Sequence, residues 1–128
     1  MSSDHRHPLG ALGERIAAHH LTKRGYEIVD RNFRTRYGEL DLVATGRDCL
    51  VFCEVKARIA RGPPGPFGPL SAVGPAKQRQ VRRMAGQWLA ERPGTERDGR
   101  GLLRFDAIGV TLSPAGELVR LEHVEDAF

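Results

Sequence analysis

Three charged side chains inside two hydrophobic segments are the residues of this sequence best suited to chemistry. Asp41 lies in ELDLVA, residues 39–44, and Glu54 and Lys56 lie in LVFCEVKA, residues 50–57. Two carboxylates removed from water are costly unless something compensates them, and Mg²⁺ does so with carboxylate, water and phosphate oxygens as its ligands. A nearby lysine can hold an attacking water or stabilise the charge that develops on a phosphate. These residue types therefore indicate metal-dependent chemistry at a phosphate group.

The same three residues also have a purely structural explanation. Glu and Lys are common on the solvated faces of antiparallel sheets, where Glu54 and Lys56 would be ordinary surface charges beside Asp41. Glu14 would then be an ordinary helix residue, and Lys77 would lay its aliphatic stem along apolar surface with its ammonium in water. The residues alone leave both explanations open.

Alternation along the two segments predicts which way their side chains point. Residues two apart in a strand share a face, so Glu54 and Lys56 point to the same side. In the other segment the same rule places Leu40 and Leu42 together on the face opposite Asp41.

Local signals predict two helices and five strands around these residues. One helix runs from Pro8 to Arg24, with Gly25 placed to end it, and a second runs from Pro75 to about Ala90. The turn Gly46-Arg47-Asp48 predicts a hairpin that would bring Asp41 close to Glu54. Strands are expected at residues 26–34, 39–44, 50–57, 102–110 and 117–124. The order of helix, three strands, helix and two strands predicts a mixed sheet with a helix on each face.

Two segments are predicted to lack regular structure. Residues 61–75 hold 4 Gly and 5 Pro, which marks residues 59–74 as a loop. No Gly-Lys-Ser/Thr follows, so this loop is not a P-loop, and its nearness to the Glu54 strand makes it a candidate for contact with a substrate. Residues 1–8 are expected to be a flexible N-terminus.

Other residues capable of chemistry are assigned structural roles. Asp106 lies in an apolar segment and is predicted to be the buried partner of an arginine. Cys49 and Cys53 would lie about 13 Å apart along a strand, too far for a disulfide, and are expected to be reduced core residues. The sequence has no Gly-x-Ser-x-Gly elbow, and its histidines lack metalloprotease spacing. All five histidines are predicted to be surface residues: His5, His7, His19, His20 and His123.

Size and composition indicate one globular domain outside the membrane. The chain has 128 residues, 40% of them hydrophobic and 28% charged. No apolar run approaches the roughly 18 residues that a membrane span needs. The N-terminus lacks the apolar region of a signal peptide, so we expect a cytoplasmic protein.

Positive charge is concentrated in the middle of the chain. Residues 31–104 hold 15 Lys or Arg against 7 Asp or Glu, whereas the remainder holds 5 against 9. Arg supplies 17 of the 20 positive residues, and its guanidinium can bind a phosphate through two hydrogen bonds. This distribution favours a polyanion as partner, although an Arg bias can also follow from genome base composition.

A known signature unites several of these residues. Asp41, a gap of 12 residues and then Glu54-Val55-Lys56 resemble the core motif of the PD-(D/E)xK nuclease superfamily. The surrounding motifs are similar to those of the small bacterial YraN-like family and extend from about residue 9 to the C-terminal Ala127-Phe128. These motifs are Gly13-Glu14, Arg31-Asn32-Phe33-Arg34, Gly38-Glu39-Leu40-Asp41-Leu42-Val43, Phe52-Cys53-Glu54-Val55-Lys56-Ala57-Arg58, Lys77-Gln78 and Arg104-Phe105-Asp106.

The resemblance implies a restriction-endonuclease-like fold, a single α/β domain over residues 1–128 whose five-stranded mixed sheet is flanked by helices on both faces. It also implies a nuclease that hydrolyses phosphodiester bonds in DNA, branched DNA included, with Mg²⁺ or Mn²⁺. Asp41 and Glu54 would bind the metal, Lys56 would position the water, and Glu14 would be a further acid near the metal. Leu40 stands where the superfamily motif has proline, a position that contributes no chemical group.

Two other functions stay open. The chain could keep the nuclease fold and bind nucleic acid without cleaving it, or its basic face could bind an acidic protein. DNA is the expected nucleic acid, no membrane is expected as a partner, and symmetric cutting of a junction would require a homodimer. Phosphate contacts are expected from six basic residues: Arg34, Arg58, Lys77, Arg79, Arg82 and Arg83.

Overall fold

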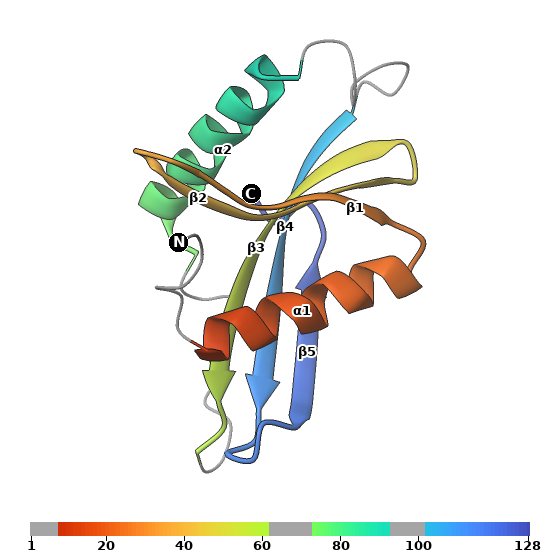
Figure 1. Cartoon of the computed structure of the whole chain (residues 1–128), viewed down its shortest axis with the longest axis vertical. Helices are drawn as coiled ribbons and strands as arrows, with labels where there is room; N and C mark the ends of the chain where they lie inside the picture. The colour runs from red at the N-terminus through yellow and green to blue at the C-terminus, as the bar shows by residue number, and fades with distance from the viewer. Residues whose placement is uncertain (1–7, 62–72, 93–101) are drawn as a thin grey trace.

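A five-stranded mixed sheet carries one helix on each of its faces (Figure 1). This computed structural model of the protein describes residues 8–61, 73–92 and 102–128. The predicted order of helix, three strands, helix and two strands is confirmed. The elements are α1 (Pro8–Lys23), β1 (Glu27–Thr35), β2 (Gly38–Gly46), β3 (Cys49–Ile59), α2 (Pro75–Ala90), β4 (Leu102–Leu112) and β5 (Leu118–Val124).

The strands follow one another across the sheet in the order β1-β2-β3-β4-β5, so β3 is central. The first three form an antiparallel meander, β4 runs parallel to β3, and β5 runs antiparallel to β4. Between β2 and β3, Arg47 and Asp48 have φ values of 53° and 61°, as in a two-residue type I′ hairpin. The predicted hairpin turn is therefore confirmed, and it sets the register in which Leu42 pairs with Cys53.

Two hydrophobic cores lie on opposite faces of the sheet, one under each helix. On the α1 face, Val51 and Cys53 of β3 pack with Leu21 of α1. On the α2 face, the ring of Phe52 meets the ring of Trp88 edge-on, with centroids 5.8 Å apart. Alternate residues of β3 therefore enter different cores, as its sequence predicts.

The alternation predicted for β2 fails at Asp41. Leu40 packs in the α2 core together with Val43, whereas Leu42 packs in the α1 core. The prediction that Leu40 and Leu42 share a face is therefore wrong. The physical reason is that β2 leaves β3 at this point: the strand pairing ends at Leu42, and the Asp41 carboxylate accepts the backbone N–H of Val55 instead.

Both helices end or begin at the residues that their sequences mark. Gly25, just after α1, has a φ of 96°, in the left-handed region that glycine adopts at low cost. Pro75 is the first residue of α2, where its missing N–H breaks no helical hydrogen bond. Cys49 and Cys53 are free thiols, as expected. Within the described ranges, neither helix is long and apolar enough to cross a membrane.

The two predicted unstructured segments are each shorter by one residue at an end that the structure describes. Pro8, the last residue of the predicted flexible N-terminus, is the first residue of α1, as the predicted start of that helix requires. At the other segment, β3 continues to Ile59, into the predicted 59–74 loop. Residues 62–72 of that loop and residues 1–7, with the first two histidines, lie outside the described residues.

Candidate active site

Two buried carboxyl groups lie opposite each other where β2 separates from β3. The pairing of β2 with β3 ends at Leu42 and Cys53, and Asp41 and Glu54 are the next residues beyond that pair. These residues are only 8% and 4% exposed, and a hydrogen bond links their carboxyl groups. The hairpin therefore brings together the two acids that were expected to approach each other.

A backbone hydrogen bond holds the Asp41 carboxyl group in place, while its surroundings disfavour its ionised form. Its Oδ2 atom accepts a hydrogen bond from the backbone N–H of Val55 at 2.8 Å. Burial raises the pKa of Asp41 well above its ordinary value, and the negative charge of Glu54 raises it further. The hydrogen bond from Val55 acts in the opposite direction without cancelling these effects. A positive charge between the two acids would therefore be favourable.

Glu14 reaches the acidic pair from α1. Gly13, directly before it, is buried so tightly that a Cβ atom there would lie 2.7 Å from Cβ of Ala57 in β3. The missing side chain therefore lets α1 approach β3 closely. Oε1 of Glu14 accepts a hydrogen bond from Nδ2 of Asn32 at 2.7 Å, and Glu14 adds to the rise in the pKa of Asp41 through its charge and a hydrogen bond.

Two lysines from different elements compensate the charge of Glu54. Nζ of Lys77 in α2 lies 3.4 Å from Oε2 of Glu54, and Lys56, two residues along β3, adds a second positive charge. Burial raises the pKa of Glu54, and the opposing effects of Lys77, Lys56 and a hydrogen bond with Asp41 do not cancel the rise. The side chain of Lys77 is 33% exposed, which places its ammonium at the solvent-facing rim of the site.

The donor set suits a divalent cation that keeps much of its water. Mg²⁺ is commonly bound by one or two carboxylates together with waters and phosphate oxygens, and Asp41 and Glu54 provide such a pair. In the described ranges, no group of three or more His, Cys, Asp or Glu side chains is placed to hold a metal ion. Asp41 and Glu54 are a carboxylate pair of the kind that could hold a hydrated Mg²⁺ or Mn²⁺.

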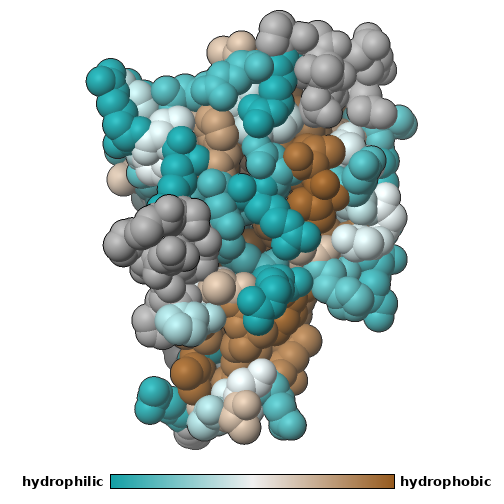
Figure 2. All heavy atoms as spheres, in the orientation of Figure 1, coloured by the Kyte–Doolittle hydropathy of each residue, from teal (hydrophilic) through white to brown (hydrophobic). Residues whose placement is uncertain are grey.

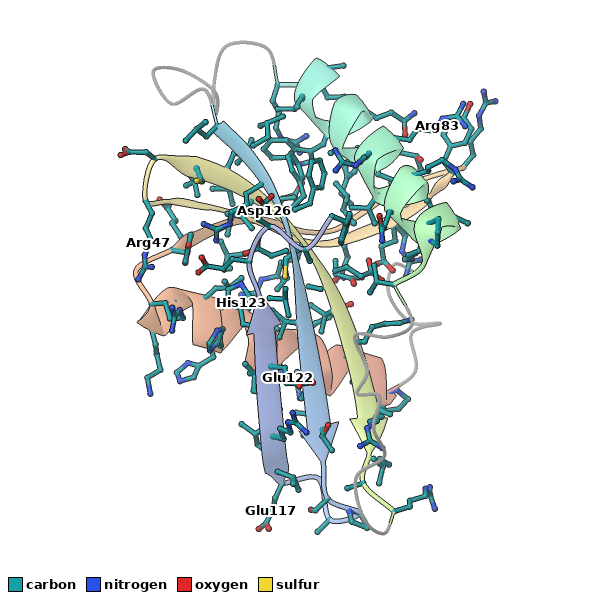
Figure 3. The ribbon with its side chains drawn as sticks, turned by 180° about the vertical axis from the view of Figure 1, so that it is seen from behind. Arg47, Arg83, Glu117, Glu122, His123 and Asp126 are labelled. Carbon is teal, nitrogen blue, oxygen red and sulfur yellow. The ribbon has the colours of Figure 1, made fainter. Side chains whose placement is uncertain are left out.

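Three arginines lie on the surface of α2, the helix that also carries Lys77. Arg79, Arg82 and Arg83 are exposed. The guanidinium carbon of Arg82 lies 4.6 Å from the centre of the Phe105 ring, and that of Arg83 lies 3.7 Å from the centre of the Tyr37 ring. A hollow of about 330 Å³ is lined in part by Tyr37, Arg79 and Arg83, and Figure 3 shows Arg83 on the outer side of α2. These positions suit contacts with phosphates.

The remaining two predicted phosphate contacts lie on different faces of the sheet. Arg58 follows Glu54 by four residues on β3 and so shares the face of the site, and its Nε atom is buried without a hydrogen-bond partner in the described structure. Arg34 of β1 pairs with Glu39 at 3.3 Å. Its neighbour Phe33 packs in the α2 core, so alternation directs Arg34 to the other face, away from the α2 arginines.

Asp106 is the centre of a buried polar network on the α1 side, next to β5. It is 0% exposed, and it accepts two hydrogen bonds from Arg104, both of 2.9 Å. The predicted role as the buried partner of an arginine is therefore confirmed. Burial alone would raise the pKa of Asp106, but hydrogen bonds from His123, Arg104 and the backbone of Asp126 outweigh it and lower the pKa.

The prediction that the histidines lie on the surface is wrong for His123. Its side chain is 7% exposed, with Nε2 at 2.8 Å from Oδ2 of Asp106 and Nδ1 at 3.0 Å from Nε2 of the half-buried His20. His19 is exposed, as expected. The error arose because His123 lies 103 residues from His20 in the chain, and no local pattern marks it as buried.

Asn32 is a site residue that the sequence did not single out for a role. It adopts a φ of 52° in β1, a conformation for which Asn is several-fold enriched among non-glycine residues. Its side-chain amide then donates to Glu14 of α1. An Asn within a strand segment is the signal that could have indicated an irregular backbone at this position.

Fold and site together define a class of protein. A single α/β domain with a mixed five-stranded sheet, in which neighbouring strands carry two acids and a lysine, is consistent with the restriction-endonuclease-like fold. The chain belongs to the uncharacterised protein family UPF0102, whose family model matches residues 13–110. The resemblance to the YraN-like family is thereby confirmed, and the matched range contains Glu14, Asp41, Glu54 and Lys56.

Relatives from several bacterial genera match nearly the whole chain. It is 45% identical over 127 residues to a UPF0102 protein of Rhodococcus jostii strain RHA1, covering 97% of this chain and 98% of that protein. A UPF0102 protein of Frankia casuarinae is 45% identical over 121 residues, covering 94% and 95%. One of Geobacter metallireducens is 41% identical over 125 residues, covering 97% and 94%.

Proposed function

We propose that this protein is a nuclease that hydrolyses phosphodiester bonds in DNA with Mg²⁺ or Mn²⁺, and that branched DNA is among its substrates. The observation that supports this proposal is the buried pair Asp41 and Glu54, in which both pKa values are raised. Such a pair is unfavourable as a structural feature, because burial and mutual repulsion both oppose ionisation. A cation shared by the two carboxylates would offset that cost.

Each residue has its own role in the proposed reaction. Asp41 and Glu54 would hold the cation, which when bound polarises the phosphate and lowers the pKa of a bound water. Lys56, on the same strand face as Glu54, would orient the attacking water, and Glu14, beside Asp41, would accept its proton. Attack at phosphorus forms one P–O bond and breaks another, and the departing oxygen takes a proton from solvent.

The basic side chains would position the DNA backbone against the site. Lys77, Arg79, Arg82 and Arg83 all lie on α2, and Lys77 contacts Glu54 directly. Lys and Arg side chains bind DNA by neutralising its phosphates and releasing counterions. The affinity for DNA should therefore fall steeply as the salt concentration increases. We place the protein in the cytoplasm, where bacterial DNA is accessible.

Cleavage of branched and linear DNA of equal sequence, with Mg²⁺, Mn²⁺ or EDTA, tests the proposal. Asp41→Asn and Lys56→Met remove a proposed ligand and the proposed ammonium with little change in size. Glu117→Gln is the matched control, because Glu117 is exposed and lies at the end of the molecule away from α2 (Figure 3).

We expect each site variant to lose about a hundredfold or more in rate and the control to keep the rate of the wild type. A wild type that cuts neither substrate with either metal, or site variants that cut as fast as the wild type, would show the proposal to be wrong.

One observation favours a second function, in which the protein binds nucleic acid without cleaving it. Nζ of Lys77 lies 3.4 Å from Oε2 of Glu54, so the charge of Glu54 is partly compensated without any metal ion. This alternative predicts DNA binding that is unchanged by EDTA and weakened by substitution of Arg79, Arg82 and Arg83. Band-shift titrations with Mg²⁺ and with EDTA distinguish the two functions.

A further inference from the structure

The edge strand β5 exposes an unusual amount of apolar surface. Leu118, Val119 and Val124 are 50%, 58% and 44% exposed, and they are three of the five exposed large hydrophobic residues in the described ranges. Figure 1 shows β5 along one side of the molecule, and within the described part of the chain only β4 pairs with it. The unpaired backbone groups on the outer side of such a strand can accept another strand.

The opposite edge, β1, is protected against such pairing. Its exposed positions are all charged, and its register shifts between Ile28 and Asp30. Charges and bulges are the usual means by which natural proteins prevent edge-to-edge pairing. The exposed charged positions are Glu27, Arg31 and Arg34.

We propose that two copies of this chain associate by antiparallel pairing of their β5 strands about a twofold axis at Leu121. In that register Arg120 of each copy lies opposite Glu122 of the other, which gives two pairs of opposite charges. Leu118 and Val124 lie at the two ends of the strand, and the extra residue Val119 lies between Leu118 and the regular part of β5. Opposite charges directly across two strands are stabilising. The charge pattern of β5 is therefore complementary to itself.

The central part of β5 has the regular geometry that this pairing requires. Residues 120–124 pair without interruption with residues 107–111 of β4, and the irregularity of β5 lies at Val119, because Thr111 pairs with Arg120 whereas Leu112 pairs with Leu118. Arg120, Leu121 and Glu122 are therefore in a regular extended strand, and Figure 3 shows Glu122 and His123 along its length.

The charges of β5 are free to change partners at little cost. Arg120 and Glu122 form an ion pair of 2.6 Å within one chain, with side chains that are 55% and 29% exposed. An exposed pair of this kind contributes little to stability, so it can be exchanged for two pairs between copies.

Apolar surface is also present on the α1 face of the sheet. Figure 2 shows apolar residues gathered on the lower half of that face, where α1 crosses the strands in Figure 1. Half-buried residues of the α1 core, including Leu12, Ile16 and Leu121, lie on this face. Burial of part of this surface would add to the strand pairing.

The pairing keeps the two copies in one sheet. Residues directly opposite in an antiparallel pair point to the same face, so α2 of both copies lies on the same side of a continuous sheet with five strands from each copy. If the proposed nuclease function holds, one dimer presents two Asp41–Glu54 sites to one DNA molecule. The association itself does not depend on that function.

Sedimentation velocity of the full chain, without DNA or metal, tests the proposal. A single paired strand buries less than a standard protein interface, so we expect a reversible dimer and measure up to about 1 mM protein. Either reversal, Arg120→Glu or Glu122→Arg, creates two pairs of like charges across the two β5 strands. Each variant should therefore raise the dissociation constant of the dimer about tenfold or more. Arg31→Glu, on the exposed face of β1, is the matched control and should leave association unchanged.

A mixture of the two reversed variants supplies the decisive measurement. The Arg120→Glu variant has an acidic β5 and the Glu122→Arg variant has a basic one, so the two strands attract each other. The mixture should therefore associate at least as strongly as the wild type, although each variant alone associates weakly. A wild type that stays monomeric throughout the concentration range overturns the proposal. A dimer that is indifferent to both reversals, or a mixture that fails to regain association, overturns it as well. Because the assay contains no substrate, its failure would leave the nuclease proposal standing.

Discussion

The carboxylate of Asp41 accepts the backbone N–H of Val55 at 2.8 Å, at the point where β2 leaves β3. A side chain thus replaces main-chain pairing, and the same bond holds the carboxylate beside Glu54. An amide oxygen can accept the same N–H. Asp41→Asn should therefore preserve the local geometry while it removes the charge, which allows the structural and chemical roles of Asp41 to be measured separately.

Asp41→Asn should be more stable than the wild type, by an amount that grows with pH. The folded wild type keeps the Asp41 proton to a higher pH than the unfolded chain, in which the pKa is near 3.8. Unfolding therefore releases a proton above that pH, and the stability of the wild type falls as the pH rises. We expect an advantage for the variant of about 1 to 3 kcal/mol at about pH 7 in EDTA, and little at about pH 4.

Urea unfolding at a series of pH values measures this difference. Glu117→Gln, which removes an exposed carboxylate, should show no such trend. An advantage of Asp41→Asn that is the same at every pH would contradict the assignment of its origin to the buried charge.

Mg²⁺ and Mn²⁺ should stabilise the wild type against heat. A cation that binds the folded state alone adds about 2.7 kcal/mol when its concentration is a hundred times its dissociation constant, which amounts to several degrees in Tm for a domain of this size. Asp41→Asn should lose this response. Differential scanning fluorimetry, with NaCl at equal ionic strength as the control for screening, measures it. Equal shifts in both proteins would indicate binding elsewhere.

Features set by neighbouring residues were predictable from the sequence. These features each depend on a few consecutive residues: the alternation of β3, the hairpin turn at Gly46-Arg47-Asp48, the end of α1 near Gly25 and the start of α2 at Pro75. The face of Leu40 was not predictable in the same way. Regular alternation along β2 ends beside Asp41, whose carboxylate accepts the N–H of Val55, 14 residues away, and no local pattern marks that contact.

Contacts between distant segments account for the other errors. His20 and His123 meet because β5 lies beside β4 and α1 crosses the same face of the sheet, and nothing local distinguishes His20 from exposed His19. Asn32 acquires its role only once α1 brings Glu14 against β1. The candidate acids were identified from their types and spacing, whereas the groups that orient them required the fold.

The contact between His20 and His123 should make the protein less stable in mild acid. Burial lowers the pKa of His20, and the positive charges of His123 and Arg24 lower it further. The unfolded chain therefore binds a proton near pH 6.5 that the folded chain does not, so stability is fully present above that pH and falls as the pH decreases.

His20→Gln should reduce this loss, because the variant has no imidazole to protonate. The expected result is a smaller slope of unfolding free energy against pH between about 5 and 6.5, measured by urea unfolding. His19→Gln is the matched control, since His19 is adjacent and exposed. If both variants keep the slope of the wild type, the acid sensitivity comes from other groups.

Gly13→Ala should destabilise the protein and displace Glu14 at the same time. A Cβ at Gly13 would lie 2.7 Å from Cβ of Ala57, and both atoms are next to the backbone, so α1 has to move away from β3. Overpacking of this kind costs about 1 to 3 kcal/mol. Gly86→Ala is the control, because nothing lies within 4 Å of its added Cβ and alanine favours a helix.

The double variant Gly13→Ala with Ala57→Gly tests the cause directly, because it removes the atom that the new methyl group meets. Chemical unfolding should show that the two changes are not additive, with the double variant more stable than the sum of the single effects predicts. DNA cleavage should recover together with stability if the position of Glu14 matters to the reaction. Recovery of stability without recovery of cleavage would show that close packing of α1 on β3 serves the fold and that Glu14 is not needed at its present position.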